Sequence, residues 1–179
     1  MDSIRPRLPQ TLTTDRLVLA TPSLAHVSEM AMLANNPAIH QVLSRLPHPY
    51  GEEDGRLFVE TIARGPEEFA WSILLEGRYI GTVGLHFPAG GPPELGYWLG
   101  QPHWGRGYAT EAGRAVVEAA RQAGGSVLRA LVLPTNAGSR HVLEKLGFAQ
   151  IGTLTHASGT LAGQQSLLVE RDLEKGGQA

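Results

Sequence analysis

Glu94-Leu-Gly-Tyr-Trp-Leu-Gly100 is the stretch that decides the fold, and Gln101-Pro-His-Trp-Gly-Arg-Gly-Tyr-Ala-Thr-Glu-Ala112 follows it directly. The first part brings aromatic and branched residues together within a few positions, as strands do, and Gly100 with Pro102 ends it. After Gly107, apolar residues recur at steps of three and four, which indicates a helix with one narrow buried face. The order is therefore strand, glycine-bearing turn and helix.

The turn between this strand and this helix is suited to phosphate. Gly105 and Gly107 carry no side chain where the backbone enters the helix, so unpaired N–H donors gather at the positive end of the helix dipole. Such a terminus binds phosphate groups. Spacing excludes two other templates: a dinucleotide fingerprint needs a glycine where Thr110 stands, and the lysine and hydroxyl of a P-loop are absent.

The rest of the chain predicts strands and helices with short connections. Phe69–Leu75 and Arg78–Phe87 flank Glu76-Gly77 and form a hairpin. The segment 35–50 follows no clean period, and 157–163 is a loop. The other expected elements are strands at 14–20, 94–99, 127–133, 149–155 and 164–170, and helices at 22–34, 52–64, from 107 to 124 and from Ser139 to Gly147.

Composition excludes several classes of function. The 179 residues are 42% hydrophobic, which is enough for one domain with a real core. A net charge of −2 with scattered Lys and Arg offers nucleic acid no basic stripe, and the absence of cysteine removes disulfides, thiolate zinc sites and a cysteine nucleophile. The seven histidines show no metal-binding spacing, so we expect no metal. No signal segment or membrane-length apolar run appears, so we expect a cytoplasmic protein with no membrane partner.

Two motifs together resemble one family. Trp104-x-x-Gly107-x-Ala109 is similar to the acyl-CoA pyrophosphate loop of the GNAT N-acetyltransferase superfamily, Gln/Arg-x-x-Gly-x-Gly/Ala. Further along, Asn136-Ala-Gly-Ser139-Arg-His-Val-Leu-Glu-Lys-Leu-Gly-Phe148 resembles the Asn-x-x-Ser-x-x-x-Leu-x-Lys-x-Gly-Phe segment of the RimJ/RimL-like branch. The resemblance covers roughly Thr14 to Leu173. Trp104 departs from the family's Gln or Arg, and we expect little effect because backbone N–H groups bind the phosphates.

The resemblance implies a fold and a domain layout. The fold is of the mixed α/β class: a GNAT fold with a mixed central sheet of six to seven strands, about four flanking helices, and splayed fourth and fifth strands. A single acetyltransferase domain is expected over 1–179, with a mobile or edge-lying lead-in at 1–10 and a flexible tail at 174–179. Relatives are often dimers, so the resemblance is compatible with a homodimer.

The resemblance also assigns a cofactor site. The pantetheine arm of acetyl-CoA should lie between the strand that ends near Leu99 and the strand 127–133, with pyrophosphate on the turn from Gly105 to Thr110. Backbone N–H groups near Trp98 and Leu99 would polarise the acetyl carbonyl. The expected cofactor-binding residues are Trp98, Leu99, Trp104, Gly105, Arg106, Gly107, Tyr108, Ala109, Thr110, Asn136 and Ser139.

Amide formation from a thioester needs a neutral amine, an electrophilic carbonyl and a proton for the departing thiolate. Ser139 begins a helix, where serine commonly serves as the N-cap; it is also our candidate proton donor, and one hydroxyl can do both. Glu94 starts the cleft strand and is the candidate base. The competing interpretation of Glu94 is a carboxylate that is simply solvated at the edge of the sheet. The alternative bases are His86 and a chain of water molecules. Glu111 in the first helical turn complements the helix dipole.

The function that follows is an acetyl-CoA-dependent N-acetyltransferase. It would transfer the acetyl group to a primary amine, either a protein N-terminal α-amine or a small-molecule amine, by direct attack in a ternary complex with CoA as product. The alternative is a non-catalytic module that binds and senses acyl-CoA, because the cofactor motifs of the two would look identical. The residues do not decide the acceptor amine, or between acetyl and longer acyl groups.

Overall fold

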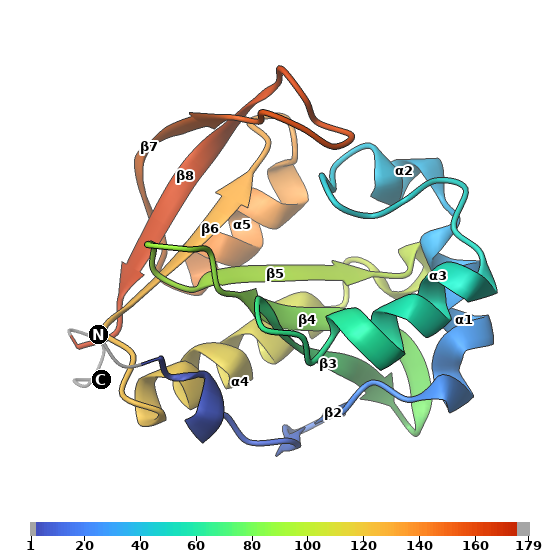
Figure 1. Cartoon of the computed structure of the whole chain (residues 1–179). Coiled ribbons are helices and arrows are strands. Elements are labelled where there is room, and N and C mark those ends of the chain that lie inside the picture. The colour runs from blue at the N-terminus through green and yellow to red at the C-terminus, as the bar shows by residue number, and fades with distance from the viewer. Residues whose placement is uncertain (1–2, 175–179) are drawn as a thin grey trace.

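One mixed β-sheet runs through the described part of the chain (Figure 1). The computed structural model describes residues 3–174. The strand order is β1-β2-β3-β4-β5-β6-β8-β7, and β5 with β6 is the parallel pair in this otherwise antiparallel sheet. The strands are β1 (Leu12–Thr13), β2 (Leu17–Ala20), β3 (Glu68–Leu75), β4 (Arg78–His86), β5 (Glu94–Leu99), β6 (Val127–Val132), β7 (Ala149–Thr155) and β8 (Gln165–Asp172).

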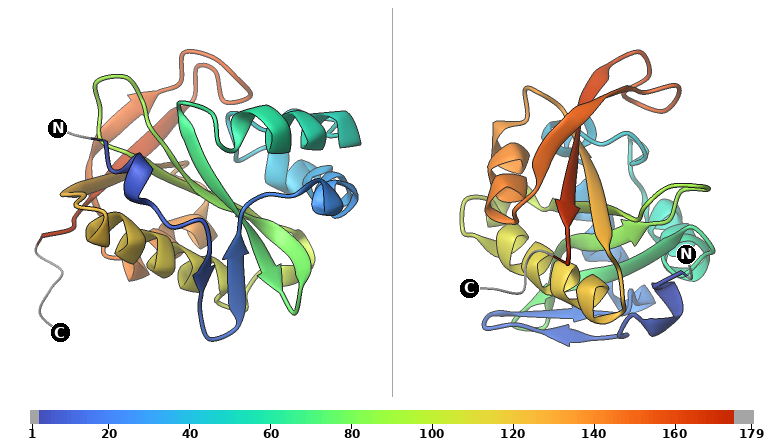
Figure 2. Two further views of the ribbon diagram at one scale, coloured as in Figure 1. Left: turned by 60° about the horizontal axis from the view of Figure 1, so that its bottom comes forward. Right: turned by 90° about the vertical axis from the view of Figure 1, so that its left-hand side faces the viewer.

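Helices cover both faces of the sheet. Figure 2 shows α4 along one face, with α1 and α3 on the other. Leu146, the residue directly after α5, packs beside Gly113 of α4. The helices are α1 (Val27–Ala34), α2 (Pro37–His40), α3 (Glu52–Leu57), α4 (Tyr108–Gln122) and α5 (Ala137–Lys145), with short 3-10 turns η1 (Arg5–Arg7), η2 (Leu24–His26) and η4 (Gln101–His103) and a π-helical turn η3 (Phe58–Ile62). This architecture confirms the predicted GNAT-type α/β fold; the additions are the two-residue β1 and the four-residue α2.

The main core lies between the sheet and α4. The helix positions that recur at steps of three and four are the buried ones, among them Ala112, Val116 and Ala120, which are fully covered. They pack against strand residues such as Trp71 and Leu128 in one continuous cluster. The sequence periodicity after Gly107 therefore identified the face of α4 that anchors the phosphate-binding turn to the sheet.

The predicted splay of the fourth and fifth strands, counted without β1, is confirmed at β5 and β6. These two strands share a single paired position, Glu94 with Arg129, and then diverge (Figure 1). On its other side, β6 pairs with β8 along its whole length, over six positions. The sheet is thus two antiparallel halves joined at one corner. We call the space between the diverging backbones of β5 and β6 the slot.

The part of the expected lead-in that the structure describes, residues 3–10, packs against the core. Ile4 and Leu8 lie in the main core with 5% and 4% of their surface exposed. Arg5 donates to the backbone carbonyls of Arg64 and Gly65, both at 2.6 Å. Burial of two large apolar side chains fixes this segment against the sheet. Residues 1–2, and all of the predicted tail except Glu174, lie outside the described residues.

Other boundaries differ from prediction for local reasons. Ser23, rather than Pro22, starts the first helical segment, because its hydroxyl accepts from the N–H of Ala25 at 3.2 Å. The helix expected at 52–64 changes to a π-helical turn at Phe58, where Ala63 N–H donates to the carbonyl five residues back at 2.8 Å. The remaining strands and the hairpin lie within a few residues of their predicted bounds.

Candidate active site

The edge of β5 that faces β6 is open beyond its first residue. Arg129 N–H donates to the Pro93 carbonyl at 2.9 Å, next to the single paired position of the two strands. Backbone groups alternate sides along a strand, so the odd-numbered residues of β5 face β6. Tyr97 and Leu99 therefore direct their N–H groups into the slot, whereas Trp98 faces β4, where it is paired with Thr82.

The turn before α4 forms a cradle of free donors. Gly105 and Gly107 have φ angles of 71° and 80°, the left-handed region that favours glycine. The N–H groups of 105–110 donate to no acceptor within residues 3–174, and the first backbone bond of the helix runs from Glu111 to the Gly107 carbonyl at 3.0 Å. A Cβ at Gly105 would meet no atom within 4 Å. The cradle is open and fits a pyrophosphate group.

Arg16, a residue that the sequence did not single out, supports this cradle. Its Nη1 donates to the Arg106 carbonyl at 3.0 Å, and its guanidinium lies 4.5 Å from the ring centroid of Tyr108. Its Nε donates to Glu111 at 2.7 Å, and the Thr14 hydroxyl donates to the same carboxylate at 2.6 Å. Burial alone raises the pKa of Glu111, but these hydrogen bonds and the guanidinium hold it below its usual value. Arg16 thus fixes the turn and adds positive charge beside it.

We expect Glu111→Gln to lower the free energy of unfolding by about 1 kcal/mol at neutral pH, because a charged hydrogen-bond acceptor is lost. The pKa of Glu111 is lower in the folded than in the unfolded chain, so its stabilisation is complete above the ordinary carboxyl range. It disappears as the pH falls through the folded-state pKa. Urea unfolding of both proteins at about pH 7 and about pH 3 measures the difference, which should shrink at the lower pH.

Glu53→Gln is the matched control for this measurement. Glu53 is an exposed carboxylate in the first turn of α3, as Glu111 is in the first turn of α4. The control should leave stability within about 0.5 kcal/mol at both pH values. If the effect of Glu111→Gln on the free energy of unfolding grew as the pH fell, the pKa of Glu111 would not be lowered in the folded protein.

Ser139 of α5 is in contact with Tyr97 of β5. The Tyr97 hydroxyl lies 2.9 Å from Ser139 Oγ and donates to the Ser139 carbonyl at 3.3 Å. Burial raises the pKa of Tyr97 to about 12, with the Ser139 bond acting in the opposite direction. Tyr97 therefore stays protonated at neutral pH. The structure places a pair of hydroxyl groups here, where the sequence indicated only one.

Asn136, rather than Ser139, is the N-cap of α5. The helix begins at Ala137, and Asn136 Oδ1 accepts from the Ser139 N–H at 3.2 Å. The expectation that Ser139 itself begins the helix is corrected, because an asparagine three residues earlier provides the cap. The Ser139 hydroxyl is consequently free of the capping role.

Trp104 ties the cradle to β5. Its indole Nε1 donates to the Leu99 carbonyl at 2.7 Å, and its side chain is 44% exposed. His103, the residue before it, has a buried Nδ1 with no partner in the described chain. Burial, with Arg106 and Arg78 nearby, lowers the pKa of His103, so this ring is neutral beside the cradle.

A cleft of about 670 Å³ lies on the opposite face of β5 from Ser139. Its floor is formed by β3, β4 and β5, and one wall by α3 and η3. Two loops approach each other at its rim, where Thr160 N–H donates to the Ser44 carbonyl at 3.2 Å. The segment expected to be irregular, 35–50, thus contributes to a wall of the cleft together with part of the loop 157–163. Apolar side chains dominate these walls, among them Leu46, Leu57, Phe58, Ile62 and Leu161.

Glu94 and His86 share the floor of this cleft. They are direct cross-strand partners on β5 and β4, so their side chains stand on the same face of the sheet. His86 Nδ1 lies 3.0 Å from Glu68 Oε1, and Arg45 Nη1 lies 2.8 Å from the same oxygen. Burial raises the pKa of Glu68, and Arg45 and His86 oppose that shift. Glu94 makes no hydrogen bond or ion pair with its side chain within residues 3–174.

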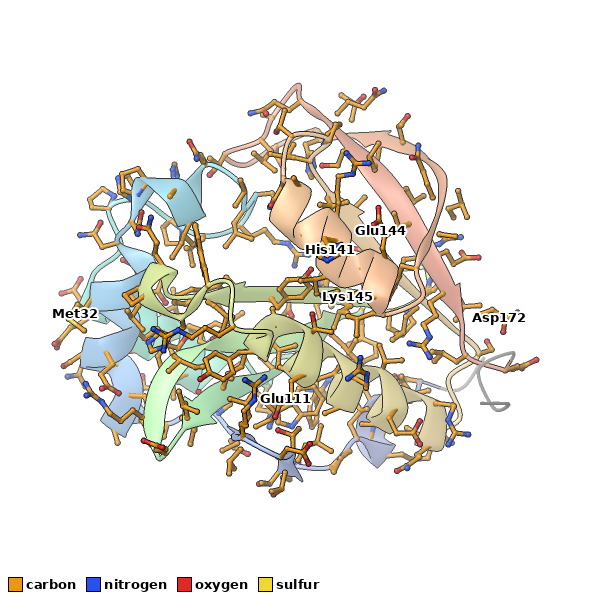
Figure 3. All side chains as sticks on the ribbon, turned by 180° about the vertical axis from the view of Figure 1, so that it is seen from behind. Met32, Glu111, His141, Glu144, Lys145 and Asp172 are labelled. Carbon is orange, nitrogen blue, oxygen red and sulfur yellow. The ribbon has the colours of Figure 1, made fainter. Side chains whose placement is uncertain are left out.

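The structure brings the predicted site residues to two sides of one strand. Gly105 to Thr110, Asn136 and Ser139 lie on the α4 and α5 side, and Glu94 lies on the cleft side. Figure 3 shows His141, Glu144 and Lys145 on α5, at the back of the molecule. Among the described residues no group of three His, Asp or Glu side chains could hold a metal, and no helix could span a membrane.

Comparisons with known proteins show to which family the chain belongs. The model of the acetyltransferase (GNAT) domain family matches residues 16–149. The uncharacterized N-acetyltransferase p20 of Bacillus licheniformis is 26% identical over 152 residues, which are 81% of this chain and 85% of that protein.

Two solved structures show the same fold at low sequence identity. The microcin C7 self-immunity acetyltransferase MccE, solved with acetyl-CoA and AMP, has a TM-score of 0.80 at 18% identity, covering 93% of this chain and 98% of that one. RimJ of Mycobacterium smegmatis, solved with CoA-disulfide, has a TM-score of 0.78 at 20% identity, covering 91% and 85%. From the matched family model, the chain belongs to the GNAT family of acetyl-CoA-dependent acetyltransferases.

Proposed function

We propose that the protein transfers the acetyl group of acetyl-CoA to a primary amine bound in the cleft, by direct attack in a ternary complex. The acceptor is a protein N-terminal α-amine or a small-molecule amine. One observation carries the proposal: the cradle of free N–H donors and the cleft lie on opposite sides of the same open edge of β5. Donor and acceptor can therefore meet there without a covalent enzyme intermediate.

The donor site uses backbone groups more than side chains. The free N–H groups of 105–110 would hold the pyrophosphate, supported by Arg16 and Trp104. The open edge of β5 at Tyr97 and Leu99 would pair with the amide groups of pantetheine as an added strand does. Asn136 has its Oδ1 occupied by the cap of α5, so its Nδ2 is the group available to pantetheine.

Acetyl-CoA supplies a thioester. Attack by the amine forms the carbon–nitrogen bond of the product amide, and the carbon–sulfur bond to CoA breaks. The N–H of Leu99 polarises the acetyl carbonyl, because it faces the slot, whereas the N–H of Trp98 is used on the β4 side. Glu94 accepts the proton of the attacking amine, directly or through water. Its carboxylate is free of partners and stands on the cleft face of the strand.

Ser139 protonates the thiolate of CoA as it leaves. Its hydroxyl lies on the α5 side of the slot and is hydrogen-bonded to the protonated Tyr97, which can replace the proton that Ser139 donates. Glu94 and Ser139 lie on opposite sides of β5, so each serves one of the two proton transfers: Glu94 on the side of the amine and Ser139 on the side of the thiolate.

We expect Ser139→Ala to lower kcat by about 100-fold, the low end of what general acid catalysis contributes, without a change in the affinity for acetyl-CoA of more than about threefold. Helix α5 should remain intact, because the N–H of residue 139 still donates to Asn136. Tyr97→Phe should give a smaller loss of kcat in the same direction. Steady-state kinetics and the melting temperature measure both effects.

Asn136→Ala separates capping from chemistry. It removes the cap and should lower the free energy of unfolding by about 1 kcal/mol, whereas Ser139→Ala should not. A Ser139→Ala protein with the kcat of the wild type would show that the hydroxyl is not the proton donor.

A further inference from the structure

A row of small residues crosses the floor of the cleft. Ala70 on β3 pairs with Gly84 on β4, and Gly84 pairs with Gly96 on β5. Because paired residues of adjacent strands project on the same face, the three positions form one line across the sheet. All three line the cleft, and the line ends at the strand whose far edge opens on the slot. The floor is therefore lowest along this row.

Two of these small residues have a packing reason to be small, and Gly96 has none. A Cβ at Gly84 would lie 3.0 to 3.2 Å from Ala70, so the two positions constrain each other. A Cβ at Gly96 would meet nothing within 4 Å, and its φ is not in the left-handed region. Glycine weakens a strand when neither packing nor a turn requires it. The space above Gly96 belongs to the cleft.

Gly96 lies between two larger side chains on the same face. Glu94 is two residues before it and Trp98 two residues after it, each about 7 Å away along the strand. The Trp98 ring is fixed by an edge contact with Tyr79, with centroids 6.0 Å apart. Gly96 thus leaves a gap bounded by the candidate base on one side and an aromatic ring on the other.

Large apolar side chains surround much of this gap, and the polar lining of the cleft includes Thr82, His156 and Ser166 as well as the row of Glu68, His86 and Glu94. Phe58 and Leu46 line the cleft from the helical and loop walls, and Leu131 and Leu161 line it from the side of β6 and β8. Glu68 is already paired with Arg45, which leaves Glu94 as the unpaired carboxylate of the floor row. A group that enters the gap meets apolar atoms, while an amine beside it meets Glu94.

We infer that Gly96 determines acceptor specificity: the gap above it receives an apolar group carried by the carbon next to the attacking nitrogen. This inference rests on the proposed function. The preferred acceptors are primary amines with a branched or aromatic substituent on the nitrogen-bearing carbon, including peptides with an apolar first residue. Unbranched amines leave the gap empty, and the transition state loses those contacts.

The test compares two acceptors, glycinamide and leucinamide, with the full-length wild type and two variants. Gly96→Val fills the gap. Gly152→Val is the matched control, since Gly152 is also a strand glycine whose added Cβ meets nothing within 4 Å, but it lies on β7 outside the cleft. We expect the wild type to prefer leucinamide in kcat/KM by about tenfold or more.

Gly96→Val should abolish that preference by raising the KM for leucinamide, with the KM for acetyl-CoA and the rate with glycinamide within about threefold of wild type. Gly96→Ala should give an intermediate preference and keeps the test valid if valine disturbs the strand. A wild type without preference, or a Gly96→Val protein that loses both amines equally while still binding acetyl-CoA, would overturn the inference. Absence of turnover with every amine would instead refute the proposed function.

Discussion

Gly105→Val is expected to weaken acetyl-CoA binding by about 100-fold or more. Gly105 has a φ of 71°, a conformation that a β-branched residue adopts only at a cost of about 1 to 2 kcal/mol. A valine would turn N–H groups of the cradle away and place methyl groups in the open space that we propose for the pyrophosphate. Loss of two charge-assisted hydrogen bonds, each worth about 1.5 kcal/mol or more, corresponds to at least that factor in Kd.

Gly77→Val separates this binding effect from backbone strain. Gly77 lies in the turn of the β3–β4 hairpin, has a φ of 78°, and also has no atom within 4 Å of an added Cβ. Both substitutions should lower the melting temperature by a similar amount. Calorimetric titration with acetyl-CoA should show wild-type affinity for Gly77→Val alone. Equal affinity in both variants would mean that the phosphates bind elsewhere.

Glu94→Gln is expected to lower kcat by about 100-fold or more, because general-base catalysis commonly contributes that factor. The amide has the size of the carboxylate, and the substitution removes no hydrogen bond or ion pair because the Glu94 side chain has no partner among the described residues. Stability and the Kd for acetyl-CoA should stay near wild type. Initial rates at saturating acetyl-CoA, with calorimetry for the Kd, measure the two quantities.

His86→Asn tests the alternative base. His86 stands beside Glu94 on the same face and is oriented by Glu68, so it is the other side chain that could accept the proton. We expect a loss of less than about tenfold for this variant. Glu144→Gln, on the outer face of α5 (Figure 3), is the surface control and should have wild-type activity. A larger loss in His86→Asn than in Glu94→Gln would assign the base to His86.

The cradle could be predicted because its signals are local. Gly105, Gly107 and the helical spacing after them lie within one short stretch, and these residue types favour the observed turn and helix. The hairpin at Glu76-Gly77 was predictable for the same reason. In each case the residue type directly limits the backbone angles.

The packing of residues 3–10 could not be predicted because it depends on distant contacts. Ile4 and Leu8 are two apolar residues among prolines and arginines, with no period that would indicate burial. They are covered because the segment docks on the sheet, where the Pro9 carbonyl accepts from the Trp71 indole at 3.1 Å. Local propensity contains no information on such a contact.

The supporting residues of the site were missed for a similar reason. Arg16 reaches Glu111 across 95 residues of chain, and Tyr97 reaches Ser139 across 42. The sequence pointed to Glu111, Ser139 and Tyr97 as single residues, but it did not show that Arg16 pairs with Glu111 or that Tyr97 pairs with Ser139. Gly96 was visible in the sequence, but only the register of β4 and β5 shows that it lies in the cleft.

The most direct test of the central claim is to incubate the protein with acetyl-CoA and a panel of primary amines and short peptides. Free thiol and acetylated amine are then quantified together. The account predicts that at least one amine class yields both products in equal amounts, and that thiol release without amine is far slower. If acetyl-CoA raises the melting temperature but no amine is acetylated, the protein is an acyl-CoA-binding module and the catalytic assignment is wrong.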